Sequence, residues 1–426
     1  MKRSSLDISR LIPVLILACA VFLTTCSGTP SSTNRKQAAE DGLTTLKQMA
    51  QDSEFQFYGY ESASDIGKEE LGDPIEVKAI DLDALIESKV PGGYMIIEKN
   101  EYLFPVMVRE KPIGSIQIMI DEGNWEYVST GSKAIIEKAL EIISANSLDP
   151  DNSYLLDIEE IELAFVGFES NGKNTLIPLF KNESYSFVPG TRYEFTKIAN
   201  EIKSEILLAR DSYNSMVLPD SNNLNQKITS KIQELPSYSS SPKSALETAK
   251  TTKKLLNIKL IPQIKSQWCW AATGRMTMIF AGGESSAITQ CAQANDAFSQ
   301  NSCCADGGLK ECNKPYRPLY DNWGFTAKKI FNPEGAALSW TALKGLIDDG
   351  KPVAFLWRWK KGGGHYMVAV GYYEDLTTNP VTRMVHINNP WPPDVGEEQS
   401  VTYDKWVGGP DFNNLQTCYF YDIVKD

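Results

Sequence analysis

Alternating apolar and polar positions in the first half of the chain predict β-strands. The alternation is found at residues 94–97, 103–108 and 113–120. It is typical of strands that bury one face. Residues 133–144 and 193–210 instead carry apolar side chains at the spacing of an amphipathic helix. Strands and helices mixed in this way favour one α+β domain over residues 41–210.

The last part of the chain has a helical half followed by a sheet-like half. Residues 269–280 and 339–349 fit helices, and Gly350 is placed to end the second one. Three strand-like runs follow, at residues 353–359, 365–373 and 383–388. Residues 256–426 therefore predict a second α+β domain, which is large enough for a core of its own.

Between these units, residues 211–255 have the composition of a linker. The stretch is rich in Ser, Asn and Pro, as at residues 236–242 (PSYSSSP), and such sequences favour loops. An exposed linker is also a preferred site of proteolytic cleavage.

The N-terminus has the pattern of an export signal. Lys2, Arg3 and Arg10 precede the apolar run 11–23, which is shorter than the ~20 residues that a membrane-spanning helix needs. We therefore expect a signal peptide over residues 1–26 and a mature protein that works outside the cytoplasm.

Cys26 stands where a bacterial lipoprotein carries its lipid. It closely follows the apolar run, although Thr25 occupies a position at which such sites usually have Gly, Ala or Ser. Cys19 is a second candidate, and an ordinary cleaved signal with an incidental Cys is the alternative. We favour lipidation of Cys26, with residues 27–40 as a tether. This predicts membrane attachment in the bacterial cell envelope, whereas the ordinary signal predicts secretion.

Composition and charge narrow the classes of function. The 426 residues are 42% hydrophobic and 23% charged, which is typical of a folded protein and excludes wholesale disorder. The net charge is −12, so the chain lacks the excess of basic residues that is typical of a nucleic-acid-binding protein. Eight of the nine Trp, six of the eight Cys and both His lie after residue 240. The residue types used in catalysis are therefore concentrated in the C-terminal part.

Cys269 and His365 are the strongest candidates for chemistry. Cys269 begins a predicted helix, where unpaired N–H groups and the helix dipole stabilise a thiolate. A thiolate nucleophile needs an imidazole that holds the ion pair and protonates the leaving group. His365 follows three glycines at the start of a strand, where a substrate backbone can approach closely. His386 is the alternative base, but it lies inside a strand and fits a structural role better.

Two polar residues complete the candidate site. Asn389, at the end of the next strand, can orient the imidazole through its side-chain oxygen. Asn388 points to the opposite face if that strand continues, so Asn389 is favoured. Gln263, six residues before Cys269, can stabilise a tetrahedral oxyanion together with the Cys269 backbone N–H.

These motifs occur in a recognisable order. They are Q-x5-C-W at residues 263–270, G-H at 364–365 and N-x-W at 389–391. The order resembles the papain-like cysteine proteases. The compact spacing is similar to the bacterial branch with staphopains, secreted effector proteases and double-glycine leader peptidases. The resemblance covers residues 256–426. It implies a two-lobed domain, with a helical lobe and an antiparallel sheet lobe, which a smaller α+β accessory domain precedes.

The resemblance implies a cysteine endopeptidase that acts on protein or peptide substrates through a thioester intermediate. Cys269 would attack the peptide carbonyl, and His365 would protonate the leaving amine. Asn389 would orient His365, and Gln263 would hold the oxyanion. No metal or organic cofactor is required. Two alternatives stay open: an acyltransferase or amidase on the same triad, and a non-catalytic surface-binding protein that has kept the fold.

Four cysteines form a separate cluster within about 22 residues. They are Cys291, Cys303, Cys304 and Cys312. In an oxidising compartment they predict two disulfides, although sequence alone cannot choose among the three pairings. A zinc site is the alternative, but the usual closely spaced ligand pairs and a nearby His are absent from the sequence. Cys418 is expected to be a buried free thiol, and Cys269 is expected to stay unpaired.

The N-terminal part is acidic and carries no catalytic constellation. Residues 1–240 have a net charge of −14, and residues 241–426 have one of +2. This arrangement resembles pro-enzymes, in which an upstream domain covers the cleft until the linker is cut. We expect latency that ends on cleavage between about residues 215 and 254. The rival interpretation is a domain that grips substrate or a surface ligand and stays attached.

Overall fold

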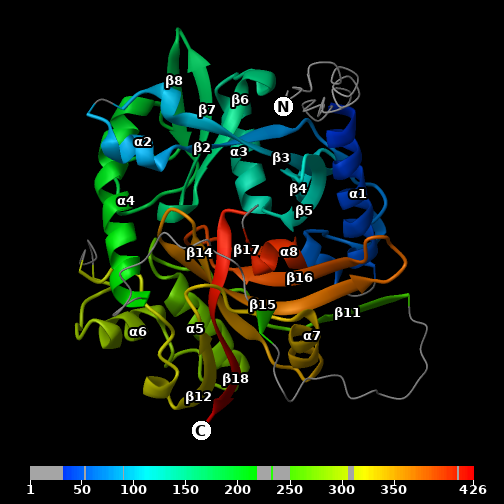
Figure 1. Cartoon of the computed structure of the whole chain (residues 1–426), viewed down its shortest axis with the longest axis vertical. Helices are drawn as coiled ribbons and strands as arrows, with labels where there is room; N and C mark the ends of the chain where they lie inside the picture. The colour runs from blue at the N-terminus through cyan, green and yellow to red at the C-terminus, as the bar shows by residue number, and fades with distance from the viewer. Residues whose placement is uncertain are drawn as a thin grey trace, which may run out of the picture.

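Figure 1 shows the computed structural model of the chain, which describes residues 32–51, 54–89, 91–217, 232–233, 250–305, 311–409 and 412–426. The predicted signal peptide, with Cys19 and Cys26, lies outside the described residues, and so does most of the predicted linker. In the described ranges, no helix is long and apolar enough to cross a membrane.

The N-terminal unit occupies the upper part of Figure 1 and mixes helices with strands. Its helices are α1 (Ser32–Ala50), α2 (Leu82–Glu87), α3 (Lys133–Ala145) and α4 (Phe195–Val217). Its strands are β1 (Glu70–Leu71), β2 (Ile75–Ile80), β3 (Ile96–Val108), β4 (Lys111–Asp121), β5 (Asn124–Gly131), β6 (Ser153–Ile158), β7 (Leu163–Ser170), β8 (Lys173–Pro178) and β9 (Tyr193–Glu194). The mixed α+β character predicted from the sequence is confirmed.

The predicted elements of this unit form where they bury an apolar face. The alternation at residues 103–108 and 113–120 falls within β3 and β4, and residues 133–144 form most of α3. The prediction of a strand at residues 94–97 is wrong for its first half, because a 3-10 turn at Gly93–Met95 precedes β3. That turn buries Met95, so its apolar residues serve a turn rather than a strand.

Three of the four helices of the C-terminal unit come before its main run of strands, as predicted, and the short α8 lies between β17 and β18. Its helices are α5 (Cys269–Phe280), α6 (Gln290–Ala297), α7 (Trp340–Asp348) and α8 (Tyr403–Val407). Its strands are β11 (Thr251–Leu255), β12 (Phe325–Phe331), β13 (Ala337–Leu338), β14 (Val353–Trp359), β15 (Gly364–Asp375), β16 (Thr382–Asn389), β17 (Glu397–Thr402) and β18 (Asn414–Lys425). The short strand β10 (Ile232–Gln233) pairs with β13.

Both ends of the segment predicted as a linker are regular structure. Helix α4 continues to Val217, and β11 pairs antiparallel with β15. Strand β11 has the sequence TTKKL, which shows no clear apolar alternation. It forms because β15 offers it a partner in the sheet, and a partner so far along the chain is invisible to local pattern.

The strands of both units join in one sheet. Its order is β12-β18-β14-β15-β16-β17-β5-β4-β3-β2-β6-β7-β8-β9, with β1 on β3 and β11 on β15. The junction is the β17–β5 pair, in which Ser400 lies opposite Thr130 and Val401 opposite Ser129. The N-terminal unit is therefore built onto the edge of the C-terminal sheet rather than attached by the linker alone.

A shared hydrophobic core strengthens this junction. One cluster of buried side chains contains Leu46 and Ile116 from the N-terminal unit together with Trp340 and Trp406 from the C-terminal unit. Burial of apolar area is the main favourable term in such contacts, so this core adds to the strand pairing in holding the two units together.

Packing within the C-terminal unit brings the candidate residues together. Helix α5 contacts β15 and β18, which places Cys269, its first residue, near the start of β15. Strand β16 runs antiparallel to β15, so Asn389 at its end returns to the same region. The division of this unit into two lobes stays a prediction.

Candidate active site

Cys269 is buried and is one of the two unpaired cysteines in the described part of the chain. Helix α5 begins at this residue with no side-chain cap from Trp268. The first turn of a helix therefore lies at the sulfur, where its N–H groups and dipole stabilise negative charge. The thiol sulfur also lies within 4.8 Å of a ring nitrogen of His365.

His365 lies between Cys269 and Asn389. Its Nε2 is 2.7 Å from Oδ1 of Asn389, and both side chains are buried. The backbone N–H of Trp391 donates to the same Asn389 oxygen at 3.0 Å, which fixes the orientation of the amide. The structure thus brings together three of the four predicted catalytic residues in the order Cys, His, Asn.

Gln263, the fourth, is fully buried beside this group. Its backbone N–H donates to the carbonyl of Pro390 at 2.9 Å, which ties it to the loop after Asn389. Its side-chain Nε2 donates to the carbonyl oxygens of Lys265 and Ser266 at 3.0 and 3.1 Å. These two carbonyls belong to the loop before Cys269, and they hold the amide in one orientation.

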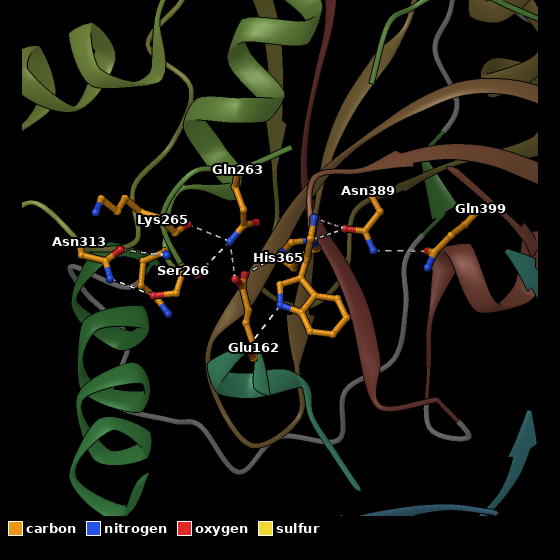
Figure 2. Close-up of polar contacts among 10 residues, drawn as sticks. Glu162, Gln263, Lys265, Ser266, Asn313, His365, Asn389 and Gln399 are labelled. Carbon is orange, nitrogen blue, oxygen red and sulfur yellow. Dashed lines mark hydrogen bonds and ion pairs between the residues drawn. The ribbon is translucent and has the colours of Figure 1, made fainter. Parts of the chain in front are cut away.

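Glu162 is a member of the site that the sequence did not predict. It comes from the turn between β6 and β7 of the N-terminal unit and points between Gln263 and His365 (Figure 2). Gln263 Nε2 donates to its Oε2 at 2.6 Å, and its Oε1 is 2.9 Å from Nδ1 of His365. Local pattern carries little signal for this role, because Glu162 belongs to an acidic run that is typical of a solvated surface.

These neighbours decide the charge of His365. Burial in itself lowers its pKa, but the hydrogen bonds and charges of Cys269 and Glu162 outweigh burial and hold the pKa well above 6.5. His365 is therefore an imidazolium at neutral pH, which is the form that can pair with a thiolate and give a proton to a leaving group.

His386, the alternative base, lies apart from this group. Its ring contacts Ser400 Oγ at 2.8 Å through Nδ1 and Tyr58 Oη at 3.1 Å through Nε2. Burial lowers its pKa to about 3, and Lys253 adds to the shift. Asn388 donates to the carbonyl of Ile258 instead of to a histidine. Both side chains thus have structural partners.

Two cavities meet at Glu162. One, of about 300 Å³, lies beside Cys269 and has Leu356, Tyr366 and Cys418 in its wall. The other, of about 400 Å³, lies beside His365 and Asn389. A cleft with space beside the thiol and beside the imidazole can accept an extended chain across the two groups.

Three donor atoms of this site could hold a metal ion. A carboxylate oxygen of Glu162, the sulfur of Cys269 and a ring nitrogen of His365 all lie within 4.8 Å of one another. Such a set suits zinc. However, the carboxylate and the imidazole are already joined by a direct hydrogen bond, so these groups satisfy one another as they stand.

The four clustered cysteines form two pairs. Cys291 pairs with Cys304 across a Cα–Cα distance of 5.7 Å, and Cys303 with Cys312 across 5.5 Å. Both distances are ordinary for disulfides. Two disulfides were predicted, and the structure selects one of the three pairings. Cys418 is buried and unpaired, as expected.

Residues 255–419 match the model of the family described as "Peptidase_C39 like family". The match covers nearly the whole C-terminal unit and contains all four predicted catalytic residues. It supports a cysteine peptidase of the papain-like superfamily in this part of the chain. The narrower likeness to the staphopain type stays a prediction. No curated protein matches the chain.

Proposed function

We propose that the protein is a cysteine endopeptidase that uses Cys269, His365 and Asn389 as a triad. The observation that carries the proposal is the position of His365, which is hydrogen-bonded to Asn389 at 2.7 Å and faces the Cys269 sulfur at the start of α5. The match to a cysteine peptidase family over residues 255–419 supports it independently.

The mechanism follows from the positions of these atoms. The Cys269 thiolate attacks the peptide carbonyl carbon and forms a C–S bond, and the oxyanion is held by Gln263 Nε2 and the Cys269 N–H. The C–N bond then breaks, and the leaving amine takes the proton from His365. Water adds to the thioester and gives a proton to His365, after which the C–S bond breaks and releases the acid.

We also propose that the enzyme works outside the cytoplasm. The two disulfide pairs are compatible with an oxidising compartment, and the N-terminal sequence supports export, with a lipid on Cys26 as the means of membrane attachment. Palmitate labelling of the exported protein, compared with that of Cys26→Ser, tests the anchor. Equal labelling of both chains would contradict it.

Latency is the third part of the proposal. The N-terminal unit covers the catalytic centre through the turn that carries Glu162, and the shared sheet and core hold it there. We infer that this unit keeps the peptidase inactive, and that cleavage between about residues 215 and 254 removes the covalent tether.

The proposed activity is tested by a peptide-library digest and a peptidyl epoxide probe. Both are applied to the wild-type chain and to Cys269→Ala, before and after the linker is cut. We expect hydrolysis and labelling in the wild type alone, and at full rate only when the linker is cut and the N-terminal unit is separated from the cleft. Since Cys269→Ala keeps Cys418, labelling that is lost in this variant belongs to Cys269. Hydrolysis that persists in Cys269→Ala would contradict the proposal.

A further inference from the structure

We propose that Glu162 acts as an internal ligand of the catalytic centre. Its carboxylate occupies the place of the reacting acyl group of a substrate and so blocks the centre. This inference rests on the proposed function, since it assigns the groups that enforce latency. The inhibitory element is then a single side chain of the N-terminal unit.

The carboxylate takes two of the three hydrogen-bond donors that the proposed mechanism uses. Gln263 Nε2, the proposed oxyanion donor, is bound to Oε2 at 2.6 Å, and His365 Nδ1, the proposed proton donor, is 2.9 Å from Oε1. The product of peptide hydrolysis is also a carboxylate at this place. Glu162 thus resembles bound product, and a substrate carbonyl cannot approach while it is there.

Charge strengthens the contact. The Glu162 side chain is 9% exposed and the His365 side chain 6% exposed. Since the pKa of His365 is held well above 6.5, the contact joins an imidazolium to a carboxylate away from bulk water. Charge-assisted hydrogen bonds of this kind are stronger than neutral ones, and screening by salt is weak at buried sites.

The backbone around Glu162 is also held in place by contacts with the C-terminal unit. Glu162 has a φ of 54°, in the left-handed region that residues with a Cβ rarely adopt. Its carbonyl oxygen accepts from the indole N–H of Trp391 at 3.4 Å. The preceding turn is anchored through Glu159, whose carboxylate accepts from the side chain of Asn413. Contacts with the C-terminal unit thus hold the turn on both sides of the carboxylate.

The same turn lies where a substrate backbone was expected. The carbonyl oxygen of Glu160 is 2.8 Å from the point where a Cβ on Gly363 would lie, so the glycine run before His365 admits the backbone of this turn. Glu160 and Glu162 both line the two cavities beside Cys269 and His365. The turn therefore crosses the cleft at the reacting centre.

A second contact holds the N-terminal unit near Gln263. Glu183 Oε1 accepts from the backbone N–H of Ser266 at 3.1 Å. The hydroxyls of Ser184 and Ser266 are 3.2 Å apart, and Asn313 donates to both of them at 3.1 and 2.9 Å. Because the blocking group belongs to the same chain, its effective concentration is high, and a free substrate competes poorly with it.

The test compares Glu162→Ala, Glu162→Gln and Glu162→Asp in the full chain. Glu169→Gln is the matched control, since Glu169 is an exposed carboxylate on the next strand, β7. Two rates are measured: labelling of Cys269 by a peptidyl epoxide, and hydrolysis of a fluorogenic peptide library. Thermal unfolding of each variant checks the fold, and the near-isosteric Glu162→Gln guards against a folding defect in Glu162→Ala.

We expect labelling at least tenfold faster in Glu162→Ala and Glu162→Gln than in the wild type. Glu162→Asp should fall in between, because its shorter arm cannot reach both donors, and the control should equal the wild type. Folded variants that are labelled no faster than the wild type would overturn the inference. Faster labelling without any hydrolysis would support Glu162 as the blocking group and contradict the peptidase. A wild-type chain that hydrolyses peptides as fast as Glu162→Ala would contradict Glu162 as the blocking group and support the peptidase.

Discussion

The carboxylate of Glu162 lies 2.9 Å from Nδ1 of His365, although 203 residues separate the two in the chain. The contact joins a turn of the N-terminal unit to the first strand residue after the glycine run of the C-terminal unit. It exists because β17 pairs with β5 and places both units along one sheet. An acidic domain without a catalytic constellation thereby reaches the centre of the proposed peptidase.

The first prediction separates the two histidines. His365→Ala should remove activity, whereas His386→Gln should keep it, because His386 contacts Ser400 and Tyr58 rather than Cys269. Both variants are made in a Glu162→Gln background, and hydrolysis of the peptide library is measured. Loss of activity in His386→Gln alone would reassign the base.

The second prediction concerns protonation of His365. The chain has two histidines, so NMR titration should show one imidazole with a pKa well above 6.5 and one near 3. Glu162→Gln should lower the higher pKa, because it removes one of the two partners that raise it. The blocked state holds this proton more tightly than an open state does. The block is therefore strongest while His365 is protonated, and it weakens as pH rises through the raised pKa. A higher pKa that is unchanged in Glu162→Gln would contradict the assignment.

The third prediction concerns stability in acid. Burial lowers the pKa of His386 to about 3 in the folded chain, whereas the unfolded chain has the ordinary value of 6.5. The free energy of unfolding is therefore highest above pH 6.5, and it decreases as pH falls toward 3. At pH 5 the loss is on the order of 2 kcal/mol, at 1.36 kcal/mol for each pH unit. Urea unfolding at pH 7 and pH 5 should show a smaller difference in His386→Gln than in the wild type. Equal differences would argue against a buried neutral imidazole.

The fourth prediction concerns the disulfides. Peptide mapping of the exported protein without reduction should find Cys291 joined to Cys304 and Cys303 to Cys312. Each bridge, over a loop this short, should contribute roughly 2–3 kcal/mol to stability. Alkylation of all four thiols without a reductant would refute the pairing.

The fifth prediction concerns linker cleavage. Because β17–β5 pairing and a shared core join the units, the two pieces should stay together after cleavage between about residues 215 and 254. We expect them to co-elute in size-exclusion chromatography, and we expect full activity only under conditions that separate them. Pieces that separate at once on cleavage would show that the linker, rather than the interface, maintains the block.

The sequence predicted which candidate residues of the C-terminal unit lie together, but it did not predict the contact of Glu162 with them. Cys269, His365 and Asn389 belong to residue types that are rare or informative in this chain, and each stands at the start or end of a helix or strand that local pattern predicts. Their mutual positions follow from α5 lying on β15 and from β15 pairing with β16.

Glu162 could not be found in the same way. It lies in the run Glu159-Glu160-Ile161-Glu162, and the sequence of such a run does not distinguish a solvated turn from one that enters a cleft. Only the β17–β5 pairing decides this, and strand pairing between distant segments leaves no local pattern. Strand β11 was missed for the same reason.

The most direct test of the central claim titrates activity against modification of Cys269. The Glu162→Ala chain is treated with increasing amounts of a peptidyl epoxide, and the fraction of Cys269 modified is measured by mass spectrometry beside the remaining peptide hydrolysis. We predict one adduct per chain, on Cys269, and hydrolysis that falls in proportion to it. Hydrolysis that continues once Cys269 is fully modified would contradict the proposed triad.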